Sequence, residues 1–335
     1  MKAAVYLGAG ALRIEERPEP SPGPGEVLVA MRACGICGSD LMEWYQDPRA
    51  PVVLGHEPAG VVVAVGEPVD APLPRPGQRV FAHHHVPCGA CDYCARGRET
   101  LCDTFKATRI VPGGMSELFL VPAPNASLDL LELPDSVSDE AATLIEPLAC
   151  AVRGLKRARV GAATRLLVVG GGQMGLLIAQ AALATGASVT VAEPREDRRA
   201  LASAFGARGV VPKLEALGVV PDVIMLATYA PEAWELALAC ADRGAVIQLF
   251  APAAPDQSRS FNVNEVFFRE LEIQATYSAG PRDTRAALGL LAAGAVSAER
   301  LITHRFGLDE AGAALAAARS REGIKVIVTS EGFTA

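Results

Sequence analysis

The sequence contains no run of lysine and arginine, and its 335 residues carry a formal net charge of −7 at pH 7. A protein that binds nucleic acid neutralises rows of phosphates with clustered basic side chains, so nucleic acid is not an expected partner. The N-terminus also lacks the basic segment and apolar stretch of an export signal, because residues 1–6 already have a strand-like pattern. We therefore expect a cytoplasmic protein with reduced cysteines.

One segment, residues 166–192, lacks charged residues over a length that can cross a bilayer. It is interrupted by a glycine cluster and by Gln173 and Gln180. A β-branched run, a glycine turn, a helical run and a second β-branched run describe it better, which is the pattern of a buried βαβ unit. No membrane association is expected.

The pattern of residue types along the chain changes near Asp139. The sequence has no internal repeat and no low-complexity segment. Before this point, short valine-rich runs alternate with proline and glycine, which is typical of a small β-barrel with long loops. The expected strands there are 27–31, 60–65, 78–82 and 116–121.

After Asp139 a helical segment, 141–160, leads into a regular alternation of strands and helices, which predicts a doubly wound parallel sheet. The expected strands are 165–169, 188–192, 222–227, 245–250 and 271–276, with helices at 173–185, 195–205 and 231–241. Two further helices, 282–293 and 309–319, precede a closing strand at 324–328 that we expect to return to the first domain.

Four cysteines, Cys88, Cys91, Cys94 and Cys102, lie within fifteen positions, and three of them are separated by gaps of two residues. Four thiolates at this spacing select tetrahedral zinc and leave no position open for chemistry. A disulfide cluster is the alternative, which the expected reducing compartment disfavours. This zinc is therefore predicted to be structural.

A second set of residues that can bind a metal would leave one coordination position open. It begins at Cys34 and Cys37, continues at His56 and Glu57, and extends to Glu146. One thiol, one imidazole and one or two carboxylates make a mixed zinc site, and three protein ligands leave a position for water or substrate. This set predicts a catalytic zinc.

A glycine-rich turn, Gly170 to Gly175, matches G-x-G-x-x-G between an expected strand and an expected helix. The glycines allow a tight turn and close approach of a pyrophosphate to the helix N-terminus. Glu193, at the end of the next strand, would accept hydrogen bonds from the adenosine ribose and disfavours a 2′-phosphate. NAD is therefore expected rather than NADP, although three arginines follow Glu193. The expected cofactor-binding residues are Gly170, Gly172, Met174, Gly175, Glu193 and Arg198.

These residues together resemble a known family. Gly55-His56-Glu57-x-x-Gly60, followed by Gly66 and Val69, resembles the zinc-alcohol-dehydrogenase signature of the medium-chain dehydrogenase/reductase superfamily. The cysteine cluster is similar to its structural-zinc lobe, and the glycine turn to its coenzyme loop. The resemblance implies an α/β protein with a GroES-like β-barrel catalytic domain, residues 1–148 and 279–335, that carries both zinc sites. It implies a Rossmann NAD-binding domain at 149–278, and dimers or tetramers.

The paired carboxylates are similar to the polyol (sorbitol/xylitol) and threonine dehydrogenase branch. There Cys37, His56 and Glu57 would hold the catalytic zinc, and Glu146 would bind the metal directly or through its water. The resemblance also gives Ser39 the task of taking the substrate proton.

A histidine often follows that serine by three residues in the family, but this chain has Met42, so the usual relay is not implied. Met42 disfavours threonine as the substrate, whereas His85 resembles a histidine that threonine dehydrogenases place near their site. His83 and His84 are expected to be polar loop residues, and Cys34, Cys150 and Cys240 core thiols.

The expected reaction is oxidation of a secondary alcohol, of polyol, sugar-alcohol or cyclitol type, to a ketone by hydride transfer to NAD+. The cofactors would be two zinc ions per subunit and NAD. An L-threonine 3-dehydrogenase is the main alternative. Reduction of a quinone or activated alkene, and a non-enzymatic zinc protein that senses a nucleotide, are further alternatives.

Overall fold

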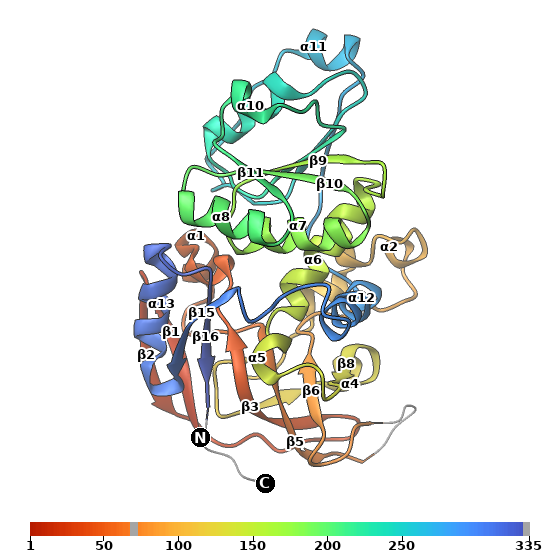
Figure 1. Cartoon of the computed structure of the whole chain (residues 1–335). Coiled ribbons are helices and arrows are strands. Elements are labelled where there is room, and N and C mark those ends of the chain that lie inside the picture. The colour runs from red at the N-terminus through yellow and green to blue at the C-terminus, as the bar shows by residue number, and fades with distance from the viewer. Residues whose placement is uncertain (68–72, 331–335) are drawn as a thin grey trace. The chain divides into compact units, whose positions relative to one another are not determined.

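A computed structural model describes residues 1–67 and 73–330, and Val69 of the sequence signature lies outside the described residues. The chain forms two compact units (Figure 1). The first combines both ends of the chain, Met1–Pro147 and Ala279–Ala335, and the second is the intervening segment, Leu148–Ser278. Each unit has its own sheet structure and hydrophobic core.

The first unit contains a seven-stranded sheet in the order β15-β16-β3-β5-β6-β8, with β7 paired to β3, and a three-stranded sheet in the order β2-β1-β4. The N-terminal strands are β1 (Lys2–Gly8), β2 (Ala11–Glu16), β3 (Val27–Gly35), β4 (Val52–Val53) and β5 (Glu57–Val65). They are followed by β6 (Arg79–Ala82), β7 (Leu118–Val121), β8 (Leu130–Glu132), β15 (Ile302–Gly307) and β16 (Lys325–Thr329).

Strand β3 organises this unit, because it pairs with β5, β7 and β16. Its apolar run is buried on both faces, and residues such as Val29 and Met31 belong to one core cluster with Val62, Phe119 and Val328. β16 lies antiparallel to β3, so the prediction that a closing strand returns to the first part of the chain is confirmed.

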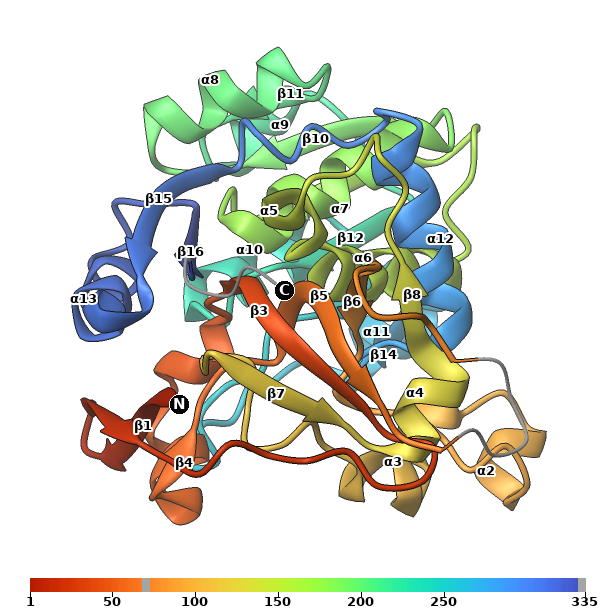
Figure 2. The ribbon, with the colours of Figure 1, turned by 90° about the horizontal axis from the view of Figure 1, so that it is seen from below.

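The helices of the first unit are short, apart from two near the C-terminal end. They are α1 (Glu43–Gln46), α2 (Asp92–Ala95), α3 (Asp103–Ala107), α4 (Ala123–Asp129), α5 (Asp139–Ala142), α12 (Pro281–Ala292) and α13 (Ala311–Ser320). Single 3-10 turns are η1 (Gly38–Leu41), η2 (Asp47–Arg49), η3 (Glu99–Leu101) and η4 (Leu308–Glu310). Figure 2 shows α13 beside β15 and β16, where its alanine-rich face adds Ala311, Ala314 and Leu315 to the core.

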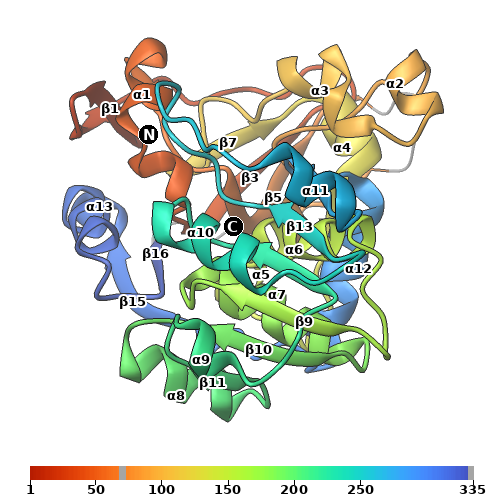
Figure 3. The ribbon, with the colours of Figure 1, turned by 90° about the horizontal axis from the view of Figure 1, so that it is seen from above.

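The second unit is a six-stranded sheet in which every pair is parallel, in the order β11-β10-β9-β12-β13-β14 (Figure 3). The strands are β9 (Arg165–Val169), β10 (Ser188–Ala192), β11 (Arg208–Val210), β12 (Val223–Leu226), β13 (Val246–Leu249) and β14 (Glu272–Ala275). Counted along the chain, this is the order 3-2-1-4-5-6 of a doubly wound dinucleotide-binding sheet. The order reverses between β9 and β12, and ligands bind at such switch points.

The helices that accompany this sheet are α7 (Gln173–Ala184), α8 (Glu196–Ala204), α9 (Leu214–Leu217), α10 (Pro231–Cys240) and α11 (Val263–Phe268). The core between β12, β13 and α10 contains Ile224, Ile247, Trp234 and Ala237. All strands expected in this segment are present within one or two residues of their predicted ends. β11, α9 and α11 have no counterpart in the prediction because each is short and lacks a clear period.

The helical segment expected at 141–160 is wrong as one element. It is divided into α5 and α6 (Ile145–Arg157), and the hydroxyl of Ser138 caps α5 by accepting from the Ala141 amide. Within the described residues, no helix is long and apolar enough to cross a membrane.

Candidate metal centres and nucleotide site

The pairing register of β3 and β5 brings Cys37, His56 and Glu57 together. Gly35, the last residue of β3, pairs with Glu57, the first residue of β5. Cys37 follows β3 and His56 precedes β5, so two segments far apart in the sequence present their side chains at one edge of the sheet. One ligand atom each from Cys37, His56 and Glu57 lies within 4.8 Å of the others.

Asp40 holds two members of this set in place. Its Oδ2 accepts the Cys37 amide at 2.9 Å, and its Oδ1 lies 3.4 Å from His56 Nδ1. Asp40 is buried. A carboxylate behind a histidine is the usual support of a metal-ligating imidazole, because it fixes the ring orientation and tautomer. Burial disfavours the charged ring, but Asp40 and Cys37 outweigh it and raise the pKa of His56.

Glu57 forms a fully buried ion pair with Lys325 of β16. The Lys325 ammonium also donates to the Ile36 carbonyl at 3.3 Å. Gly35 is required here, since a Cβ at that position would overlap both the Glu57 carboxylate and the Lys325 ammonium. Burial raises the pKa of Glu57, which Lys325 and His56 oppose.

The other Glu57 oxygen, Oε1, is buried and has no hydrogen-bond partner in the described part of the chain. A buried carboxylate oxygen without a partner is costly unless a cation or donor faces it. The thiol, imidazole and carboxylate around it are the ligand types of a zinc ion with an open position. This set therefore fits zinc.

Glu146, in the first turn of α6, converges with His83 and His84, so that one ligand atom each lies within 4.8 Å of the others. Its charge also contributes to raising the pKa of Glu57, after the larger effect of burial. His83 lies in the loop after β6, as expected, but it is fully buried and not a solvent-facing polar residue. Ser39 is half-buried on η1, two residues after Cys37.

His85 lies beside His84, with ring centroids 3.9 Å apart, but its hydrogen bond is made outside the group. Its Nδ1 lies 2.7 Å from the Thr108 carbonyl, and burial together with Arg109 lowers the pKa of His85 to about 3. The ring is therefore neutral and donates to that carbonyl. Burial also holds the pKa of His84 well below its ordinary value.

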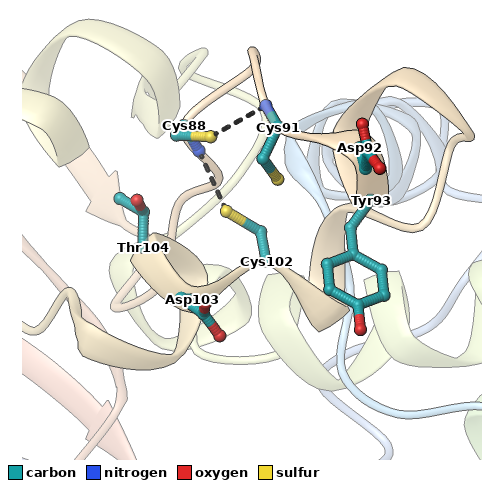
Figure 4. A pocket seen from close by; sticks show the side chains of 7 residues that line it. All are labelled: Cys88, Cys91, Asp92, Tyr93, Cys102, Asp103 and Thr104. Atoms are coloured by element: carbon teal, nitrogen blue, oxygen red, sulfur yellow. Dashed lines mark hydrogen bonds between the residues drawn. The ribbon is translucent and has the colours of Figure 1, made fainter.

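The four cysteines of the lobe fit a closed tetrahedral site. Figure 4 shows three of them, Cys88, Cys91 and Cys102. The Sγ of Cys94 lies 3.9 Å from the Sγ of Cys88 and 3.6 Å from that of Cys91. Zinc–sulfur bonds of about 2.3 Å in a tetrahedron place the sulfurs about 3.8 Å apart. The thiols are free, and these separations are those of shared ligands rather than of disulfides.

Backbone amides face two of these sulfurs. The amides of Ala90 and Cys91 donate to Cys88 Sγ at 3.4 and 3.3 Å, which lowers the pKa of the Cys88 thiol. Burial opposes ionisation of Cys102, but the amides of Cys88 and Phe105 outweigh it and bring the pKa of that thiol down to about 6. Amide donors that favour thiolates suit a metal-binding lobe.

The glycine turn joins β9 to α7 at the switch point of the second unit's sheet. Gly170 has a φ of +105°, and Gly172 is the N-cap of α7. A Cβ on Gly175 would overlap the Gly170 carbonyl, so only glycine lets the helix start this close to the strand. Met174 lies in the first turn of α7. The cradle fits a pyrophosphate at a helix N-terminus.

Glu193 closes this cradle from the end of β10. Its Oε2 accepts the Gly171 amide at 2.6 Å, and its Oε1 accepts the Arg195 amide at 3.0 Å. Arg198, in α8, is buried near Gly172. The residues predicted to bind the cofactor therefore lie together at one end of the sheet.

Comparison with known proteins supports this description. Residues 23–135 match the family described as an alcohol dehydrogenase GroES-like domain, and residues 174–293 match the family described as a zinc-binding dehydrogenase. D-Altritol 5-dehydrogenase of Agrobacterium fabrum (strain C58) is 34% identical over 323 residues, which covers 92% of this chain and 94% of that protein. The chain belongs to the zinc-dependent medium-chain dehydrogenases.

Further relatives agree on the branch and on the fold. Sorbitol dehydrogenase of Gallus gallus is 31% identical, with 97% of this chain and 95% of that protein covered. A putative zinc-binding dehydrogenase of Sinorhizobium meliloti 1021, solved bound to NADP, has a TM-score of 0.87 at 29% identity, with 98% of each chain covered. The chain is an alcohol-oxidising enzyme of the sorbitol/polyol branch, so the prediction of a GroES-like domain with a Rossmann domain is confirmed, and a non-enzymatic role is set aside.

Sequence reasoning did not identify Asp40, Lys325 or His83 as parts of these sites. Asp40 follows Cys37 by three residues, the spacing at which its carboxylate accepts the Cys37 amide, and this was a usable signal. Lys325 is separated from Glu57 by most of the chain, and only the pairing of β16 with β3 brings it close. Cys34 and Cys240 are buried as expected, whereas Cys150 is half-buried.

Proposed function

We propose that this enzyme oxidises a secondary hydroxyl of a polyol to a ketone and transfers the hydride to NAD+. The observation that carries the proposal is the convergence of Cys37, His56 and Glu57 into an open, mixed-ligand set. The similarity to altritol and sorbitol dehydrogenases supports a polyhydroxylated substrate. The overall change converts the alcohol and NAD+ into the ketone, NADH and one proton.

The metal would be held by Cys37, His56 and Glu57, with Glu146 close enough to join the shell or its water. A bound zinc ion supplies a Lewis acid that polarises a hydroxyl and lowers its pKa. Asp40 orients His56 and the Cys37 backbone, and Lys325 fixes one oxygen of Glu57. These contacts preorganise the ligands before substrate binds.

Ser39 is proposed to accept the substrate proton. It is half-buried on the same turn as Asp40, directly after the strand that delivers Cys37. Position 42 is a methionine and ends this turn, so an imidazole cannot pass the proton onward from there. A polyol is therefore favoured over L-threonine.

We propose NAD+ as the hydride acceptor, held by Gly170, Gly172, Met174, Gly175, Glu193 and Arg198. Glu193 presents a carboxylate at the end of β10, where a 2′-phosphate would be repelled. The unit Leu148–Ser278 would then be the NAD-binding domain, and the unit formed by the two chain ends the catalytic domain with both zinc sites.

The lobe of Cys88, Cys91, Cys94 and Cys102 is proposed to hold a second, structural zinc. We further propose a homo-oligomer, a tetramer or a dimer, in the cytoplasm. The exposed apolar side chains of α11 support the association, since patches of this kind are usually covered by a partner. The free thiols suit a reducing compartment.

The test is NADH formation at 340 nm with zinc-loaded protein and NAD+ across a panel of polyols, cyclitols, simple secondary alcohols and L-threonine. We expect turnover on a polyhydroxylated substrate and its loss in Cys37→Ser. Cys34→Ser, which removes a neighbouring buried thiol outside the set, is the matched control. Turnover of L-threonine alone, or near-normal turnover in Cys37→Ser, would contradict the proposal.

A further inference from the structure

A third group of ligand-type side chains lies in the same unit. It shares no residue with Cys37, His56 and Glu57, although its Glu146 is also proposed above to reach the metal of that set. His83 and His84 directly follow β6, and Glu146 lies in the first turn of α6. We propose that His83, His84 and Glu146 form a separate seat for a borderline divalent cation of the zinc type. This goes beyond the two zinc ions of the proposed function.

The protonation pattern of His83 leaves one nitrogen available to a ligand. His83 Nδ1 lies 2.8 Å from Asp129 Oδ2, and both side chains are fully buried. A carboxylate only accepts hydrogen bonds, so Nδ1 carries a proton toward Asp129, and Nε2 is the ring nitrogen that faces the other side chains of the group. Nε2 is buried without a hydrogen-bond partner among the described residues.

Hydrogen bonds hold Asp129 and the backbone of His83 in place. Its two oxygens accept the Thr284 hydroxyl at 2.7 and 2.9 Å, and the Asn125 amide donates to the His83 carbonyl at 2.9 Å. A carboxylate that holds one nitrogen of a histidine while the other nitrogen faces a ligand set is the usual support of a metal ligand.

The charges also favour a cation. Asp129 is fully buried, and the guanidinium beside it, Arg285, is 3.7 Å away and half-exposed. Glu146 adds a second buried carboxylate. A divalent ion between His83 and Glu146 would be attracted by both carboxylates.

His84 completes the set. Its Nδ1 is buried without a hydrogen-bond partner in the described chain, and its ring centroid lies 4.9 Å from that of His56. Two imidazoles and one carboxylate are a common zinc set with an open position. Because a carboxylate has two oxygens, Glu146 can serve this seat and still face the neighbouring one.

The experiment counts bound metal. Purified protein is equilibrated with Zn2+ alone and its zinc per subunit is measured by mass spectrometry, together with His84→Gln, Cys37→Ser and the double variant. We expect each single variant to bind one ion fewer than the unsubstituted protein, and the double variant two fewer. His85→Gln is the matched control and should lose none, because His85 bonds to Thr108 outside the set.

Two results would overturn the proposal. If His84→Gln keeps all its zinc, the group is not a metal seat. If the double variant loses no more than either single variant, one ion is shared by both sets. Asp129→Asn, which keeps the shape of the side chain, should weaken zinc retention against a chelator.

If the variants do not fold, a Co2+ titration of the unsubstituted protein decides. The proposed seat has no thiolate, so it should add visible cobalt absorption after the sulfur-to-cobalt band has saturated. Saturation of both together would refute the seat. Neither result depends on polyol oxidation, so the proposed function is judged separately by NADH formation.

Discussion

In the set of Cys37, His56 and Glu57, one buried ion pair has a large effect on stability. Glu57 and Lys325 are both inaccessible to solvent, and neither has water to solvate its charge. Breaking a buried ion pair by removing one partner costs about 3–5 kcal/mol, because the other charge is left uncompensated. The stability of the first unit therefore depends on Lys325 and on any other cation that compensates the charge of Glu57.

This coupling gives the first prediction. Lys325→Met should lower the free energy of unfolding of the metal-free protein by about 3–5 kcal/mol. The loss should be smaller in the zinc-loaded protein, since the metal supplies positive charge next to Glu57. Urea unfolding of both forms measures the difference. Lys156→Met, at an exposed position, is the control, and an equal loss with and without zinc would contradict the argument.

Glu193 gives the second prediction. Glu193→Ala should lower kcat/KM for NAD+ by about tenfold or more, as expected when a charged hydrogen-bond acceptor is removed, at about 1.5–3 kcal/mol. The ratio of kcat/KM for NADP+ to that for NAD+ should rise, because the carboxylate no longer repels a 2′-phosphate. Steady-state kinetics with both cofactors measure this. Glu196→Ala, an exposed carboxylate nearby, should leave the ratio unchanged.

At the scale of elements, the cysteine lobe and the β3–β5 edge carry two different kinds of metal set. The lobe is closed by four sulfurs on short helical turns, whereas the edge set has three ligands held by strand pairing. A closed site contributes to folding, and an open site contributes to chemistry.

The third prediction separates the two sets. Cys91→Ser should lower Tm by roughly 6–12 °C, which corresponds to about 3 kcal/mol for a domain of this size. Cys37→Ser should abolish turnover with a smaller change in Tm. Thermal unfolding and NADH formation on the same samples measure both properties. A Cys91→Ser enzyme with unchanged Tm would show that the lobe does not stabilise the fold.

Local patterns and long-range pairing explain what sequence reasoning could reach. The strands of the second unit were predictable because parallel strands are continuous apolar runs bounded by glycine and by capped helices. The cysteine spacing and the glycine turn are likewise local. The Lys325–Glu57 and His83–Asp129 pairs depend on register and on helix placement, so no local signal reports them. β15 was missed because its residues alternate between polar and apolar over a short length.

At the scale of the whole molecule, the apolar surface of α11 is unusually exposed. Val263, Phe267 and Phe268 are 70%, 71% and 76% accessible, and Phe267 and Phe268 lie next to each other with ring centroids 5.2 Å apart. Large aromatic side chains at this exposure mark an association surface more often than a free one.

The fourth prediction follows from this surface. Phe267→Glu combined with Phe268→Glu should dissociate the proposed homo-oligomer into smaller species, because two charges would have to be buried at the interface. Light scattering after size exclusion measures the mass. Leu214→Glu, which changes an exposed apolar residue of α9, is the control. A double variant with unchanged mass would place the interface elsewhere.

The return of β16 to β3 has a consequence for biosynthesis. A ribosome releases the segment Leu148–Ser278 before it has made β16, so that segment can fold as a unit while the nascent first unit still lacks a central strand. Glu57 then remains without its ammonium partner until Lys325 emerges. Messenger truncation or translational arrest ahead of this codon would therefore yield a chain with a folded second unit and an unfinished sheet in the first unit, a natural substrate for cellular quality control.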